Sequence, residues 1–217
     1  GFINSGVWSS DTWVHNSSDL FPKIRYKRSY EVLYLDKYNV QEIFEKMSTG
    51  NSKVIVRGRI NAEDEACADI DLRTDYFEKY NTSELIVGFS GILEGGGGKT
   101  TEGEKTRDVK IITDRTFIAS TGPGFSINNL TIDFVKTDEQ DENIEITNGL
   151  LSQSQISEGS ISKLVLNIEA PVSVDLDKSS DNIGLIAPVI QSTSLSGVTI
   201  NAKDKSKALL LATSDED

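Results

Sequence analysis

A recurring spacing of 34 residues is the feature that most constrains how this chain can fold. Three sets of apolar residues share it: Ile127, Ile161 and Leu195; Leu130, Leu164 and Val198; and Ile132, Leu166 and Ile200. Fixed periods of about 20–50 residues are typical of solenoids and other repeat architectures. A helical repeat of this length would show two amphipathic stripes, whereas these units carry short β-branched runs that alternate with polar residues. The spacing therefore predicts an all-β fold, a right-handed parallel β-helix whose coils stack their inward apolar residues.

A second stretch recurs almost in step with the first. The segments NGLLSQSQI (148–156) and IGLIAPVIQ (183–191) place Gly149 and Gly184 35 residues apart. The polar loops TDEQDEN (137–143) and DLDKSSDN (175–182) are expected at equivalent places in two coils. Both loops would then project from one side of the stack.

One short helix is expected near the N-terminus, in NVQEIFEKMSTG (39–50). Asn39 can cap it, Glu42 follows at the capping-box spacing, and Gly50 supplies a left-handed stop. The predicted buried stripe contains Val40, Ile43, Phe44 and Met47. Strands are predicted over 53–60, 84–94, 109–113, 125–135, 161–168 and 195–202.

The glycine run EGGGGKT (94–100) raises the question of nucleotide binding. A phosphate-binding loop needs a glycine five positions before the glycine of its Gly-Lys pair, but Leu93 stands five positions before Gly98. It must also open into a helix, and the following TTEGEKTRDVK has no apolar helical stripe. We therefore interpret the run as a tight turn in which glycine adopts a positive φ, with Lys99 in an exposed loop.

Charge and composition exclude several kinds of partner. The net charge of −12 argues against nucleic acid and anionic membrane surfaces, both of which attract basic patches. No apolar run approaches the roughly 20 residues of a membrane span. The single cysteine, Cys67, excludes an internal disulfide framework.

Catalytic and metal-binding side chains are scarce. His15 is the only histidine, and it lies in a segment with no recognisable triad partners. With Cys67 it cannot supply the four ligands of a structural zinc site. No His-Glu-x-x-His motif occurs. We assign no catalytic, cofactor-binding or metal-binding residue and expect no cofactor.

Acidic residues are the remaining candidates for chemistry. Polysaccharide-cleaving enzymes need paired carboxylates on one face. Asp69 and Asp71 of ADIDL point to one side of a strand, and Asp133 and Glu145 are expected near a coil edge. In the structural alternative Asp69 caps a turn and Asp71 ends a strand. We prefer this alternative, because no aromatic and basic cluster for sugar binding shows in the coils.

A cation site is a further alternative for the run DLDKSSD (175–181), whose oxygens have a calcium-loop spacing. The run lacks the glycine at the sixth position, and Ile186 stands where the glutamate at the twelfth is needed. A solvated loop is the preferred interpretation.

The order of several short motifs resembles the GLUG-type modules of large bacterial surface proteins, which also occur in the non-catalytic part of bacterial IgA proteases. The motifs are ADIDL (68–72), FSGILEGGGG (89–98), INNLTI (127–132), NGLL (148–151), ISKLVL (161–166), IGLI (183–186) and LSGVTI (195–200). The opening segment, with Trp8, Pro22 and Ile24, resembles the tail that closes such a module. Glu94 stands where the family has aspartate, and the glycine run is expanded.

The resemblance implies a domain organisation and a function. Residues 1–26 would close a preceding module, and 27–217 would form the β-helix module of a larger protein. The expected role is a non-enzymatic adhesive or spacer module at the cell surface or outside the cell, with a host or neighbouring-cell protein or glycan as partner. The alternatives are a carbohydrate-active β-helix enzyme and a substrate-positioning accessory domain of a secreted protease.

Overall fold

The chain divides into two compact units, Gly1–Tyr30 and Glu31–Asp217. In the first unit, strands β1 (Trp13–Val14) and β2 (Lys23–Ile24) pair antiparallel, with Trp13 opposite Ile24. The predicted boundary at 26/27 falls near this division, and the role of the first segment stays a prediction. The computed structural model describes residues 13–14, 23–24, 30–49, 52–57, 63, 65, 68–80, 86–95, 109–136, 143–203 and 210–213.

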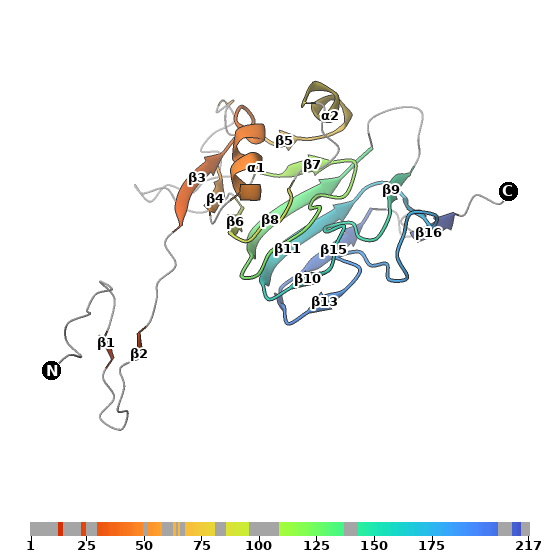
Figure 1. Cartoon of the computed structure of the whole chain (residues 1–217). Helices are drawn as coiled ribbons and strands as arrows, with labels where there is room; N and C mark the ends of the chain where they lie inside the picture. The colour runs from red at the N-terminus through yellow and green to blue at the C-terminus, as the bar shows by residue number, and fades with distance from the viewer. Residues whose placement is uncertain are drawn as a thin grey trace. The chain divides into compact units, whose positions relative to one another are not determined.

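The second unit is mostly strands, and every strand pairing described in it is parallel (Figure 1). This confirms the all-β expectation. The strands are β3 (Glu31–Leu35), β4 (Ser52–Val56), β5 (Ile70–Asp71), β6 (Ile92–Glu94), β7 (Ile111–Thr113), β8 (Ser126–Phe134), β9 (Ile144–Ile146), β10 (Ile156–Ser157), β11 (Ser160–Ile168), β12 (Val172–Asp175), β13 (Ile190–Gln191), β14 (Ser194–Ser196), β15 (Thr199–Ala202) and β16 (Leu210–Thr213). The largest sheet runs in the order β14-β11-β8-β6-β4-β3.

The register of this sheet follows the 34-residue spacing. Ile127 of β8 pairs with Ile161 of β11, and Ile161 pairs with Leu195 of β14, which confirms the predicted ladder. The bridge between Gly149 and Gly184 confirms the second recurrence. Ile127 and Ile161 are buried, whereas Leu195, on the last strand of the ladder, is 42% exposed.

The loops 137–143 and 175–182 do not occupy equivalent places, so that prediction is wrong. β9 pairs with β12 in a register of 28 residues, with Ile144 opposite Val172. Nine residues join β8 to β9, but only three join β11 to β12. The longer connection moves to the next corner in the later segment, between Val174 and Gly184, and this restores the spacing to 35. The near-constant period therefore hides an exchange of loop length between two corners.

Two corners of the chain carry a left-handed backbone in each successive segment. One set is Gly124, Glu158 and Ser192, and the other is Asn129, Lys163 and Gly197, each with a φ between 46° and 79°. Both sets repeat at 34 residues. The second set interrupts the long strands and separates β14 from β15.

Long insertions enter the earlier strands at the corner that Asn129 occupies in β8. β6 pairs with the first half of β8 and β7 with its second half, so residues 95–110 are inserted between two halves of one strand position. Residues 57–69 lie in the same way between β4 and β5, which pair with β6 and β7 respectively. The predicted strand 84–94 is correspondingly shorter: only β6 is a strand, and Gly88 before it has a φ of 66°.

Gly95, the first of the four glycines, is required for a reason other than the predicted positive φ. Its amide donates to the carbonyl of Asn128 at 2.8 Å, and a Cβ built on it would lie 1.7 Å from the carbonyl oxygen of Asn129. Close backbone approach therefore selects glycine here. Gly96, Gly97, Gly98 and Lys99 lie outside the described residues.

Helix α1 (Val40–Thr49) confirms the predicted helix and its apolar stripe, because Val40, Ile43, Phe44 and Met47 are all buried. The capping differs from expectation. The Asn39 side chain accepts from the Asp36 amide at 2.9 Å and donates to the Tyr34 carbonyl at 2.8 Å, so it fixes the loop that leads into the helix. A second helix, α2 (Thr74–Tyr80), was not predicted.

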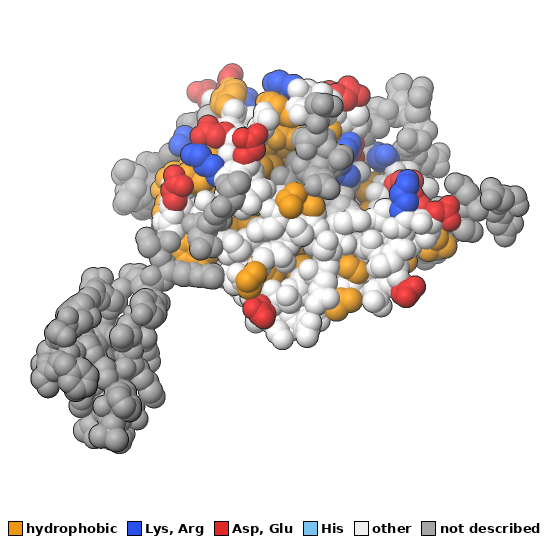
Figure 2. Space-filling model, in the orientation of Figure 1, with side chains coloured by type: hydrophobic (Ala, Val, Ile, Leu, Met, Phe, Trp, Pro, Cys, Tyr) orange, Lys and Arg blue, Asp and Glu red, His pale blue; other side chains and the backbone are white. Residues whose placement is uncertain are grey.

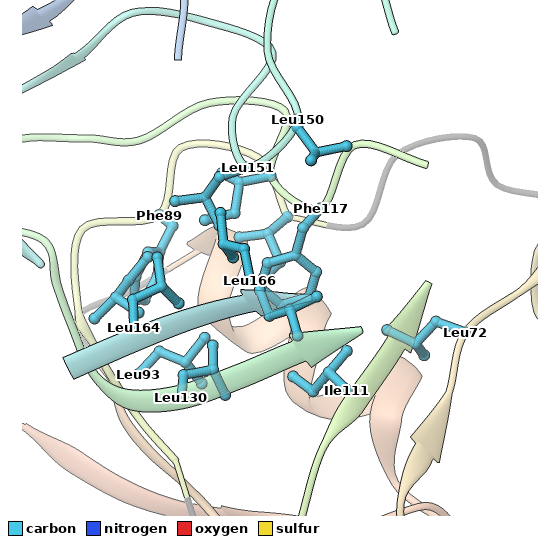
Figure 3. Packing of buried hydrophobic residues seen from close by; sticks show 14 of the residues in the cluster. Leu72, Phe89, Leu93, Ile111, Phe117, Leu130, Leu150, Leu151, Leu164 and Leu166 are labelled. Carbon is cyan, nitrogen blue, oxygen red and sulfur yellow. The ribbon is translucent and has the colours of Figure 1, made fainter. Parts of the chain in front are cut away.

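The core lies on the inner side of the large sheet. In Figure 3, Leu164 and Leu166 of β11 point toward Phe89, Leu151 and Phe117, which come from other segments. The ring of Phe44 on α1 meets Phe117 edge-on, with 6.3 Å between centroids. Helix α1 therefore packs its apolar stripe into the core that the strands share.

Candidate functional site

The acidic pair singled out in the sequence lies at β5, where both carboxylates are engaged. Asp69 Oδ1 accepts from the backbone amide of Lys110 at 3.0 Å. Asp71 ends β5 and receives Arg73 through two contacts, Nε to Oδ1 at 3.0 Å and Nη2 to Oδ2 at 2.8 Å. The hydrogen bond from Arg73 holds the pKa of Asp71 below its ordinary value. Asp71 therefore stays ionised at neutral pH and cannot act there as a general acid.

The second predicted pair, Asp133 and Glu145, is not brought together. Asp133 lies in β8 and Glu145 in β9, which belong to different sheets. Asp133 is 6% exposed, and Lys110 Nζ meets its Oδ2 at 3.0 Å. That bond raises the pKa of Lys110. Asn167 Nδ2 donates to the other oxygen of Asp133 at 2.6 Å, which leaves this carboxylate in a closed, structural arrangement.

Beside β5 lies an open depression of about 240 Å³ lined by Asp71, Arg73, Asp75 and Tyr76. We call it the α2 depression. Three of its residues flank the start of helix α2 or lie in its first turn. Sequence reasoning included Asp71 but missed the others, because the helix itself was not recognised. The available signal was the aromatic spacing of Tyr76 and Tyr80, one helical turn apart.

The wall formed by α2 is fixed by contacts with the end of β7. Asp114 Oδ2 accepts from the Thr74 amide at 3.2 Å and from the Thr74 hydroxyl at 2.8 Å. Arg115 Nε meets Asp114 Oδ1 at 3.0 Å, and the guanidinium carbon lies 3.5 Å from the ring centroid of Phe77. Asp114 is 6% exposed and thus ties the helix to the sheet from a protected position.

The loop 175–182 has its carboxylate occupied by the chain itself. Lys178 Nζ lies 2.8 Å from Asp175 Oδ2, and the amides of Asp177 and Lys178 donate to Oδ1 at 3.1 and 3.3 Å. The Lys178 hydrogen bond lowers the pKa of Asp175. In the part of the chain that the structure describes, no three His, Cys, Asp or Glu residues are grouped to hold a metal ion. His15 and Cys67 lie outside that part.

The charged side chains are unevenly spread over the surface. Figure 2 shows them gathered around the two helices, whereas the region over β10 and β13 is largely uncharged. The α2 depression belongs to the charged region. Within the described residues, no helix has the length and apolar character needed to cross a membrane. Comparisons with family models, curated proteins and solved structures find no match to this chain.

Proposed function

We propose that residues 27–217 form a right-handed parallel β-helix that serves as a non-enzymatic adhesive or spacer module of a bacterial secreted or cell-surface protein. The resemblance to GLUG-type modules suggests this role. The parallel register of β8, β11, β14 and β15 supports the architecture, because each segment adds one strand to the same ladder. A stack of such segments makes a stiff body that carries loops at its corners.

The observation that carries the proposal is that outer polar side chains bond to their counterparts 34 residues away. The described bonds are Ser160 to Ser126, Ser162 to Asn128, Asn167 to Asp133, Asn201 to Asn167 and Lys203 to Glu169. Groups that bond one another in this way stiffen the outer surface. They are also withdrawn from acid–base chemistry, which favours a structural role over catalysis.

Charge limits the choice of partner. The net charge of −12 favours a basic protein patch or a neutral glycan over an acidic polysaccharide. The test is to measure binding of the purified chain to a glycan array and to immobilised host-cell extract at low and high salt. We expect saturable binding without turnover, weakened by salt where the partner is a basic protein. Absence of binding to both would contradict an adhesive role and leave the spacer role.

A carbohydrate-active enzyme is the second candidate, and the α2 depression is the observation that favours it. Two carboxylates, a guanidinium and a phenol line one concave surface. Such groups suit glycoside chemistry when the carboxylates are about 5–10 Å apart. Turnover of a polysaccharide that is lost in Asp71→Asn, with folding retained, would establish this candidate over the first. The third role, an accessory domain of a secreted protease, would instead require increased cleavage by a protease partner.

A further inference from the structure

We propose that the α2 depression is a binding site for one neutral sugar residue of a glycan. This inference rests on the adhesive function proposed above and specifies the surface and the ligand. It is carried by the residues that line the depression, by the way they are held, and by the charge they leave inside it.

The depression has the size of a subsite. Its volume of about 240 Å³ is below the roughly 300–1,000 Å³ of pockets that enclose drug-sized ligands. It is open to solvent, so a longer chain can continue outward from a ring seated in it. A single ring of a glycan therefore fits better than a complete oligosaccharide.

Its lining offers the two kinds of contact that a sugar ring needs. The half-buried Tyr76 supplies an aromatic surface for the C–H groups of the ring, and it packs with Phe77 and Tyr80 at centroid distances of 5.6 and 4.6 Å. Burial raises the pKa of Tyr76 to about 12, so its hydroxyl stays protonated at physiological pH. Carboxylates accept hydrogen bonds from sugar hydroxyls, and Asp71 and Asp75 supply them.

The two carboxylates differ in how they are prepared. Asp71 is held in one orientation by the two contacts from Arg73, whose Nη1 also donates to the Lys136 carbonyl at 3.3 Å. Asp75 is exposed, and the structure gives its carboxylate no hydrogen-bond or ion-pair partner among the described residues. One fixed acceptor and one uncommitted acceptor thus face the same space. Fixed groups lose little freedom when a ligand binds.

Charge selects a neutral ligand. Two carboxylates and one guanidinium leave the lining with a net charge of −1, which disfavours uronic and sialic acids. A basic side chain of a protein partner would have to approach Arg73, which repels it. A neutral ring with vicinal hydroxyls meets neither penalty.

The test uses the full chain, labelled for amide NMR, and titrates it with methyl β-glucoside, methyl β-galactoside, methyl α-mannoside and N-acetylglucosamine. Methyl β-glucuronide is the charged comparison, and a short lysine peptide probes the basic-partner alternative. We expect at least one neutral sugar to shift amides of residues 71–80 saturably, at about millimolar Kd. The glucuronide should bind at least tenfold more weakly.

Variants locate the site. Asp75→Ala and Tyr76→Ala should each weaken binding about tenfold, while Glu78→Gln, an exposed change on the same helix outside the lining, should leave it unchanged. Asp75 is exposed, so its replacement keeps the test valid even if Tyr76→Ala disturbs the helix. If the chain binds glycans and both variants bind as well as the wild type, this inference fails and the adhesive function stands. If only the lysine peptide binds here, the sugar assignment is overturned.

Discussion

The amide Nδ2 of Asn167 donates to Oδ1 of Asp133 at 2.6 Å, from the equivalent position on the neighbouring strand. Asn201 repeats the relationship one strand further, donating to Asn167 Oδ1 at 2.9 Å. The row begins at Lys110, which pairs with the other oxygen of Asp133. A buried carboxylate is thus satisfied by a lysine on one side and an amide on the other. Breaking either contact leaves part of a buried charge without a partner.

Asn167→Ala should therefore lower the free energy of unfolding by about 1.5–3 kcal/mol, the range for a hydrogen bond to a charged group. Ser162→Ala is the matched control on the same strand, because it removes a neutral bond to Asn128 at 2.8 Å. Its cost should be about 0.5–1.5 kcal/mol. Urea unfolding of both variants measures the difference. Equal costs would show that Asp133 does not depend on Asn167.

The ladders were predictable from the sequence because their residues repeat in kind as well as in spacing. Ile127 and Ile161 are β-branched, buried and 34 residues apart, so local preference and long-range pairing agree. The same agreement made α1 predictable, since its four apolar residues form one stripe. Wherever one segment gives both signals, the fold follows from the sequence.

Helix α2 could not be predicted because its fixing contacts are distant. It has seven residues, and only Phe77 is buried, which is too little for a periodic stripe. Asp114, which accepts from Thr74 at the start of the helix, lies 40 residues away in sequence. The α2 depression depends on this contact, so most of its lining was missed with the helix. Corner loops were misplaced for a related reason, since a net period conceals lengths that compensate one another.

The left-handed corner at Lys163 predicts a stabilising substitution. Lys163 has a φ of 51°, whereas glycine stands at the equivalent position 197 with a φ of 64°. A left-handed backbone costs a side-chain-bearing residue about 1–2 kcal/mol, and glycine regains this at an entropic cost of about 0.5–1 kcal/mol. Lys163→Gly should raise stability by about 0.5–1 kcal/mol, measured by urea unfolding. Lys163→Ala keeps the strain and should change little, so a gain with alanine would refute the explanation.

Gly95→Ala tests the close approach found in the glycine run. A Cβ at this position would lie 1.7 Å from the Asn129 carbonyl oxygen, so the two segments must separate. We expect a loss of about 1–3 kcal/mol or more, as for other overpacked sites. Gly88→Ala is the comparison, because its Cβ would meet nothing within 4 Å and only its φ of 66° is unfavourable. A thermal midpoint that falls less for Gly95→Ala than for Gly88→Ala would contradict this account.

The pair of Asp71 and Arg73 predicts a dependence of stability on pH. Because the folded-state pKa of Asp71 lies below its ordinary value of 3.8, the ionised form favours the folded state. The contribution is present above pH 3.8 and is lost as the pH falls through the lower folded-state value. Its size should be about 0.2–1 kcal/mol, because the pair is partly exposed. Urea midpoints of the wild type and Asp71→Asn should converge in acid and diverge toward neutrality. Curves that stay parallel would show that the contact adds nothing.

Position within the stack should decide what an apolar residue contributes, even at equivalent places in one ladder. Ile161 lies between Ile127 and Leu195, is 1% exposed and packs in the shared core. Leu195 is 42% exposed because its strand is the last of the ladder. Ile161→Ala should cost about 2–5 kcal/mol, as for buried aliphatic residues, whereas Leu195→Ala should cost less than half as much. Chemical unfolding of both variants at one temperature makes the comparison. Similar costs would mean that another part of the protein covers Leu195 and buries it as deeply as Ile161, so the end of the ladder would not be open to solvent.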